Sequence, residues 1–151
     1  MDKKNKIFEN FWPTKNLPTW EEIINDLDIN VKNNDLVKVL DNFGVVTHKG
    51  DRIQKIKSLQ DYVHQNFAPH ERFCSSHIYI SLLSNSKTFG RHKDKTDVYF
   101  VLALGSMEWV VEYDEGVLSA ILRPGDMIYL PKGVYHTPIP LSPRVGISIG
   151  F

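Results

Sequence analysis

One stretch decides the fold: Gly125-Asp-Met-Ile-Tyr-Leu-Pro131-Lys-Gly133-Val-Tyr-His136. Gly125 permits a tight turn into a strand because glycine has no Cβ. Pro131 and Gly133 then shape the loop that leaves this strand. The loop aims His136 back toward the strands. The four positions together predict a small β-barrel with His136 facing its interior.

A second group of polar residues precedes this stretch, in Phe89-Gly90-Arg91-His92-Lys93-Asp94. Residues two apart in an extended backbone project from the same face, so His92 and Asp94 can act together. Two imidazoles and one carboxylate can occupy one face of an octahedral metal and leave positions open for substrate and dioxygen, as in non-haem iron oxygenases. We predict that His92, Asp94 and His136 bind a metal and are catalytic. The alternative is a barrel whose metal site has been lost or reused.

Short apolar segments with a period of two surround both groups. Hydrophobic and polar residues alternate in Met107–Tyr113, whereas Val98–Leu104 is apolar on both faces. Burial on both faces is expected of a strand between a helical layer and a barrel interior. Turns are predicted at Asp114–Gly116 and Arg123–Asp126. The predicted strands are 76–83, 98–104, 107–113, 117–122, 127–130 and 145–151.

The N-terminal part of the chain has helical patterns instead. Thr19 and Glu22 have the spacing of a capping box, and an apolar stripe follows them. Two further helices are predicted over 35–44 and 51–67, where apolar residues recur at helical spacing. The predicted fold is therefore mainly β. We expect one domain of residues 1–151, in which a helical region, 1–70, packs on a barrel core, 71–151.

Composition limits the partners of the protein. Eighteen basic and eighteen acidic residues cancel, so charge indicates neither nucleic acid nor an anionic membrane as a partner. The polar opening of the chain lacks an apolar signal core, and no apolar run is long enough to span a bilayer. Cys74 is the only cysteine, which excludes an internal disulfide and fits a reducing compartment. A cytoplasmic location is therefore expected.

The second half of the chain resembles JmjC-type proteins of the cupin fold, in particular the bacterial ribosomal oxygenases and the factor-inhibiting asparaginyl hydroxylase. The resemblance implies a double-stranded β-helix, also called a jelly-roll barrel. It implies that His92, Asp94 and His136 hold iron(II), and that 2-oxoglutarate and oxygen are used to hydroxylate proteins or related substrates. It also implies that Tyr79 contacts 2-oxoglutarate. The segments that carry the resemblance are His92–Phe100, Gly105–Trp109, 124–136 and Ile147–Phe151.

One position departs from this family pattern. Met107 stands two residues after Gly105, where the relatives have a Lys or Arg that anchors the far carboxylate of 2-oxoglutarate. Arg144 is the replacement candidate, because it resembles the Arg-x-Ser anchor of other 2-oxoglutarate oxygenases, although Gly146 occupies the serine position. Ser148 shares its strand parity and is predicted to bind the cosubstrate with Arg144 and Tyr79. The alternative is that Arg144 is a solvated charge at a strand edge.

Several neighbouring residues have two interpretations. Gly146 and Gly150 either make room for a ligand or permit close strand packing. Asp97 either orients a metal-binding histidine or is an exposed turn carboxylate. His77 is interpreted as an ordinary histidine, although its strand parity matches that of Tyr79.

The main functional prediction is an iron(II)- and 2-oxoglutarate-dependent dioxygenase that acts as a hydroxylase, with proteins among the candidate substrates. Met107, Trp109 and Val111 are expected to wall a dry cavity around the site. Two alternatives stay open. One is a metal-dependent cupin that does not use 2-oxoglutarate, such as a dioxygenase or isomerase, and the other is a non-catalytic binding module. Exposed barrel edges are compatible with a homodimer.

Overall fold

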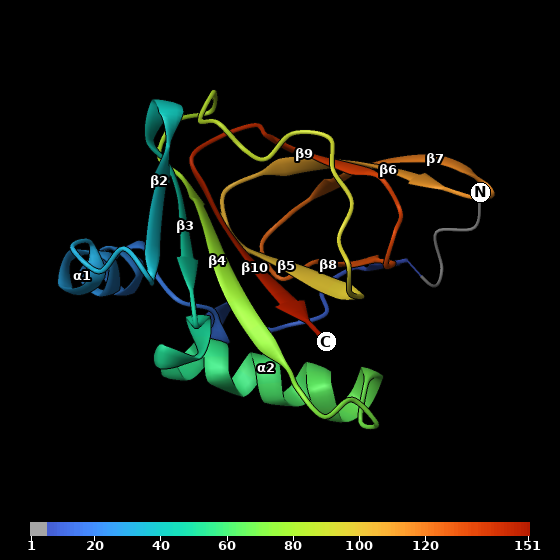
Figure 1. Cartoon of the computed structure of the whole chain (residues 1–151), viewed down its shortest axis with the longest axis horizontal. Coiled ribbons are helices and arrows are strands. Elements are labelled where there is room, and N and C mark those ends of the chain that lie inside the picture. Colours follow the sequence, from blue (N-terminus) through green and yellow to red (C-terminus); the bar gives the residue numbers. More distant parts are fainter. Residues whose placement is uncertain (1–5) are drawn as a thin grey trace.

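Two β-sheets face each other, and both helices lie outside the larger one in the computed structural model (Figure 1). The structure describes residues 6–151. The sequence expectation of no signal segment rests on the polar N-terminal residues, and almost all of these lie outside the described range. The helices are α1 (Trp20–Asn30) and α2 (Gln54–Phe67), and single 3₁₀ turns cover Thr14–Asn16, Asp41–Phe43 and Gly50–Arg52.

All strand pairs are antiparallel. The larger sheet has the order β1-β8-β5-β10-β4-β3-β2, and its strands are β1 (Ile7–Phe8), β8 (Met127–Leu130), β5 (Val98–Leu104), β10 (Arg144–Gly150), β4 (Ser75–Ser81), β3 (Gly44–His48) and β2 (Val37–Leu40). The smaller sheet has the order β7-β6-β9, with β7 (Gly116–Leu122), β6 (Met107–Tyr113) and β9 (His136–Pro140). The predicted mainly β, cupin-type architecture is confirmed.

Two apolar layers stabilise this arrangement. One lies between the helices and the larger sheet, and the other lies between the two sheets. Strand β5 contributes to both, because Val101 and Ala103 face the helices while Phe100 and Leu102 face the smaller sheet. Burial on both faces, predicted from the continuous apolar run, is therefore confirmed. The bounds predicted for β5, β6 and β8 also agree with the structure.

The helical predictions have mixed outcomes. The capping box of α1 is present: the Glu22 backbone N–H donates to Thr19 Oγ1 over 3.2 Å, and the Thr19 N–H donates to Glu22 Oε1 over 3.3 Å. The helix predicted over 35–44 is wrong, because Val37–Leu40 forms strand β2 against β3. β-branched valines and this long-range pairing outweigh the helical spacing. The region 1–70 therefore adds three strands to the larger sheet.

Gly146 lies opposite Tyr79 on β4, at a point where the barrel is tightly filled. A Cβ at position 146 would meet Phe100 Cζ at 1.9 Å, whereas a Cβ at Gly150 would meet nothing closer than 3.5 Å. Gly146 thus permits close packing. Gly150 leaves space along the pocket described below.

Gly146→Ala is expected to reduce the free energy of unfolding by roughly 2 to 3 kcal/mol, because the added methyl group must displace the buried Phe100 ring. Gly150→Ala, on the same strand and face, is the matched control and should change stability by less than about 1 kcal/mol. Urea unfolding measures both. Equal stability losses in the two variants would contradict the packing role of Gly146.

Candidate metal centre

His92 and His136 lie opposite each other in an isolated antiparallel bridge. The His92 N–H donates to the His136 carbonyl over 3.0 Å, and the His136 N–H donates to the His92 carbonyl over 2.8 Å. Directly opposed residues of such a bridge project from the same face, so the backbone brings the two imidazoles together. The Gly133 N–H also donates to the Asp94 carbonyl, over 2.9 Å. The two sequence motifs are therefore joined by main-chain hydrogen bonds.

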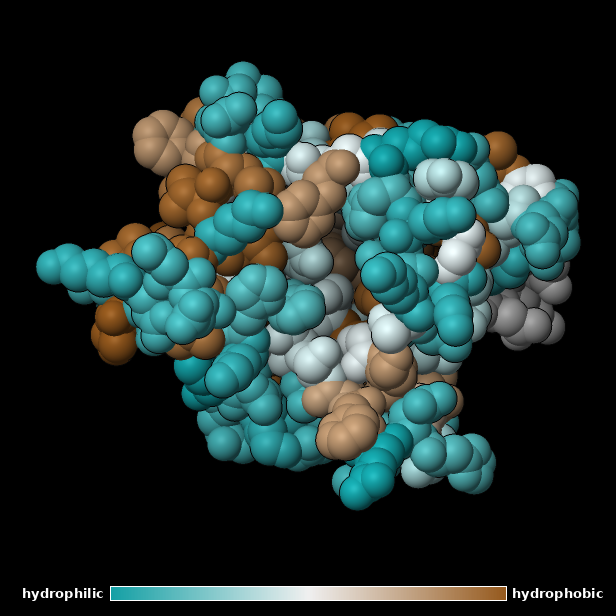
Figure 2. Space-filling model, viewed as in Figure 1, coloured by the Kyte–Doolittle hydropathy of each residue, from teal (hydrophilic) through white to brown (hydrophobic). Residues whose placement is uncertain are grey.

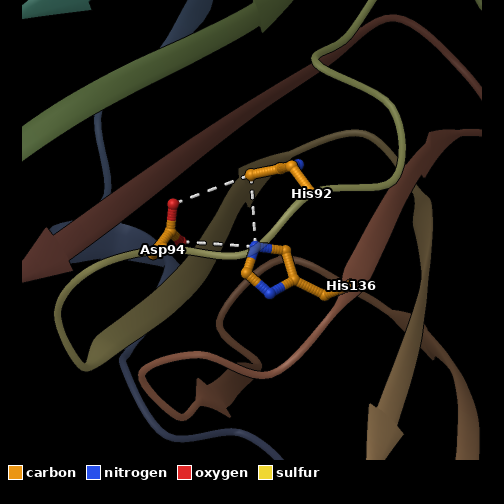
Figure 3. A group of neighbouring side chains, drawn as sticks. All are labelled: His92, Asp94 and His136. Carbon is orange, nitrogen blue, oxygen red and sulfur yellow. Dashed lines mark hydrogen bonds and ion pairs between the residues drawn. The ribbon is translucent and has the colours of Figure 1, made fainter.

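The three side chains point toward one another at the start of β9 and in the segment before β5 (Figure 3). The Nε2 atoms of His92 and His136 are 3.2 Å apart. Asp94 places its carboxylate oxygens 3.3 Å from His136 Nε2 and 3.8 Å from His92 Nε2. Among the described residues these form the only group of His, Cys, Asp or Glu side chains with metal-binding geometry.

Hydrogen bonds at the other ring nitrogens set the histidine tautomers. His92 Nδ1 lies 2.7 Å from the Gly90 carbonyl, and His136 Nδ1 lies 3.0 Å from the Val134 carbonyl. A carbonyl oxygen only accepts, so each Nδ1 carries a proton, and the tautomer that can bind a metal presents the Nε2 lone pair. Two lone pairs and a carboxylate then face one another at short range. Such a donor set is suited to a divalent cation, so the residues fit a metal.

The carboxylate is suited to this role at neutral pH. In the metal-free site the hydrogen bond between His136 and Asp94 lowers the pKa of the carboxyl group more than partial burial raises it. The positive charge of the nearby histidines, when their rings are protonated, acts in the same direction as this hydrogen bond. The side chain of His136 is 1% exposed, while those of His92 and Asp94 are partly open to solvent. The centre therefore has a closed side and an accessible side.

The centre opens into a cavity of about 220 Å³ between the two sheets. In the space-filling view, a hollow with hydrophilic side chains along one side is visible on this face (Figure 2). The cavity is bounded by alternate residues of β4 and β10, so side-chain parity places these residues on one wall. Of the residues predicted to bind the cosubstrate, Tyr79, Arg144 and Ser148 all line it.

Arg144 is buried, with 2% of its surface exposed, so its interpretation as a solvated edge charge is wrong. Its Nε donates to Ser81 Oγ over 3.0 Å, but its Nη1 has no hydrogen-bond partner. Within residues 6–151 no carboxylate forms an ion pair with it. Burial lowers the pKa of Arg144 to about 10, so it remains a cation at neutral pH. An unpaired buried cation in a cavity indicates a site for an anion.

Tyr79 and Ser148 lie beside this arginine. Burial raises the pKa of Tyr79, an effect that the Ser148 hydroxyl and the charge of Arg144 partly offset. His77 pairs with Ser148 across the strands and also lines the cavity, so its interpretation as an ordinary histidine missed its position. Burial lowers the pKa of His77, and its neighbour His48 lowers it further. Strand parity with Tyr79 was the available signal.

Other expected neighbours of the centre lie elsewhere. Met107 and Val111 are fully buried in the layer between the sheets and do not line the cavity, whereas Trp109 does. Asp97 accepts hydrogen bonds from the Tyr129 hydroxyl over 3.1 Å and the Lys132 N–H over 2.8 Å. It is therefore an exposed carboxylate that shapes a turn, and the acceptor that orients His92 is the Gly90 carbonyl.

The ribosomal oxygenase YcfD from Escherichia coli, in complex with cobalt and 2-oxoglutarate, matches 96% of this chain with a TM-score of 0.73 and 17% identity. Residues 112–151 match the JmjC domain family. The chain has a JmjC-type fold. YcfD in complex with cobalt and succinic acid gives a TM-score of 0.74 at 18% identity, again over 96% of this chain. In both cases the match covers 47% of YcfD, so the chain spans about half the length of that protein.

A weaker structural likeness is to an enzyme of a different name. A variant of oxalate decarboxylase from Bacillus subtilis is 15% identical to this chain, with a TM-score of 0.54, and the match covers 78% of this chain and 27% of the decarboxylase. No curated protein sequence matches the chain. Within residues 6–151, neither helix has the length and apolar character needed to cross a bilayer.

Divalent metal is expected to stabilise this JmjC-type fold, because only folding brings the three donor side chains together. At a free metal concentration one hundred times the dissociation constant, the gain is about 2.7 kcal/mol. For a chain of this size that gain raises the melting temperature by roughly 5 to 10 °C. Scanning calorimetry with and without metal tests this. The exposed His70 is the control: His70→Ala should keep the increase and His136→Ala should lose it, whereas an increase in both would contradict the site.

Proposed function

We propose that the protein is an iron(II)- and 2-oxoglutarate-dependent oxygenase that hydroxylates its substrate. The observation that carries the proposal is the unpaired cation of Arg144 in the same cavity as the three metal-binding donors. A ligand complementary to both has an anionic group at one end and metal-chelating oxygens at the other. 2-Oxoglutarate has this construction, and YcfD, of similar fold, is known in complex with cobalt and 2-oxoglutarate.

Each side chain then has a defined part in the reaction. Iron(II), when bound, would supply the redox chemistry that activates dioxygen. His92, Asp94 and His136 would hold this iron. Arg144 donates to the far carboxylate of the cosubstrate, and the neighbouring Tyr79 and Ser148 hydroxyls help to orient it. The reaction converts 2-oxoglutarate, oxygen and a C–H bond into succinate, carbon dioxide and a C–OH group.

Succinate formation tests this proposal. Protein supplied with iron(II), ascorbate and oxygen is expected to convert 2-oxoglutarate to succinate, slowly even without substrate. Asp97→Ala should retain this conversion, since Asp97 shapes a turn outside the centre. If iron-loaded protein neither binds 2-oxoglutarate nor forms succinate, the proposal is wrong.

A protein substrate is part of the proposal. One observation supports it: YcfD, whose fold is similar, is a ribosomal oxygenase. When ribosomal proteins are incubated with the enzyme and 2-oxoglutarate, at least one is expected to gain a single oxygen atom, measured by mass spectrometry. If none gains oxygen, the substrate is not a ribosomal protein.

A second candidate function is a metal-dependent cupin that does not use 2-oxoglutarate. It is favoured by Met107, which replaces a basic residue with a fully buried apolar one, and by the likeness to oxalate decarboxylase. This candidate predicts that the protein binds manganese(II) and a smaller carboxylate such as oxalate more tightly than it binds 2-oxoglutarate. Competition calorimetry with the two acids distinguishes the functions.

A further inference from the structure

Trp109 has a buried hydrogen-bond donor for which the fold provides no acceptor. Its side chain is 4% exposed and lines the cavity, and its Nε1 has no partner. A buried polar group without a hydrogen bond is costly, and such groups in folded proteins usually meet a ligand or an ordered water. Trp109 and Arg144 are the two cavity residues with an unpartnered buried nitrogen in the part of the chain that the structure describes.

The two donors approach the cavity from different sheets. Arg144 belongs to β10 of the larger sheet, and Trp109 belongs to β6 of the smaller one. The Trp109 ring lies 5.5 Å from the His136 ring and 5.0 Å from the Phe100 ring, measured between centroids. The Trp109 ring is therefore on the side of the cavity next to His136, while Arg144 lies beside Ser81.

We propose that the Trp109 N–H binds the ligand by donating a hydrogen bond to an oxygen of the bound oxoacid, at the end of the oxoacid nearer to His136. This inference rests on the proposed function. The ligand class that satisfies both donors is a short dicarboxylate or oxoacid with oxygens at both ends, held from both sheets. Trp109 thus takes part in cosubstrate specificity, in addition to the packing for which its ring is suited.

The chain provides a matched control for this donor. Trp12 also has a buried Nε1 without a partner, but it packs against Phe11 and Tyr62 on the helical side and does not line the cavity. The two indoles differ in position and share the same lack of a partner. A ligand effect confined to Trp109 would therefore reflect the cavity and not a general property of buried indoles.

The experiment is an NMR titration of zinc(II)-loaded, ¹⁵N-labelled protein with 2-oxoglutarate, with calorimetry in parallel. The chain has three tryptophans, and single Trp→Phe variants assign their indole resonances. The Trp109 indole proton is expected to move downfield as a hydrogen bond forms, while that of Trp12 stays in place. Trp109→Phe, which keeps an aromatic ring and removes the donor, should bind 2-oxoglutarate about tenfold more weakly, and Trp12→Phe should bind as wild type does.

The outcomes separate the two proposals. Binding of 2-oxoglutarate with an unmoved Trp109 resonance, or with full affinity in Trp109→Phe, overturns the role of Trp109 and leaves the proposed function intact. Absence of 2-oxoglutarate binding by calorimetry overturns both. Since the resonance is measured on the wild-type chain, the test holds even if Trp109→Phe does not fold.

Discussion

Asp94→Ala is expected to abolish succinate formation and to weaken metal binding by more than about 100-fold. Asp94 is the one anionic member of the donor set. Loss of a residue that only hydrogen-bonds to a metal ligand already lowers metal affinity about 10- to 100-fold, and loss of a ligand itself should cost more. The two imidazoles that remain offer neutral lone pairs without charge compensation. Metal content after dialysis, together with succinate formation, measures the effect.

Asp97→Ala is the control for this prediction. It removes a carboxylate three residues away, which is exposed and bonded to Tyr129 and Lys132. This variant should keep its metal and its activity. Full metal content in Asp94→Ala would show that Asp94 is not a metal ligand.

Arg144→Met is expected to weaken 2-oxoglutarate binding about 100-fold and yet leave thermal stability unchanged or higher. The affinity falls because a charge-assisted contact to the far carboxylate is lost. Stability does not fall because Arg144 is a buried cation without an ion-pair partner, and replacing such a charge with an apolar side chain of similar length is often neutral or stabilising. Calorimetry and a thermal melt measure the two effects on one sample.

The exposed Arg91 provides the comparison. It forms an ion pair with Glu112 outside the cavity, with 2.7 Å between Nε and Oε2. Arg91→Met should therefore bind 2-oxoglutarate as wild type does. Unchanged affinity in Arg144→Met, or a large loss of stability, would instead make Arg144 a structural residue and remove the main support for 2-oxoglutarate as cosubstrate.

The strands and the histidines could be predicted because short-range patterns determine them. β5, β6 and β8 have a clear period of two or a continuous apolar run between turn residues, and the structure keeps their predicted bounds. The spacing from Gly125 to His136 predicts a histidine that faces the barrel interior, and the side chain of His136 is 1% exposed beside His92 and Asp94. The strand β9 that follows was missed, since Thr-Pro-Ile-Pro lacks a clear alternation and two prolines disfavour a strand.

Long-range contacts explain what could not be predicted. Residues 37–40 became a strand because β3 lies beside them, and nothing local to Val37 or Leu40 specifies that partner. The burial of Arg144 depends on the pairing of β10 with β4, which places Ser81 opposite it. The unpartnered nitrogens of Arg144 and Trp109 are visible only once both sheets are assembled.

Anaerobic titration with iron(II), followed by 2-oxoglutarate, tests the central claim most directly. If one cavity holds both metal and cosubstrate, a weak visible charge-transfer band should appear and saturate with 2-oxoglutarate. The band should be absent in Asp94→Ala and require about 100-fold more 2-oxoglutarate in Arg144→Met. Iron binding without this band, at 2-oxoglutarate concentrations that saturate related oxygenases, would contradict the account.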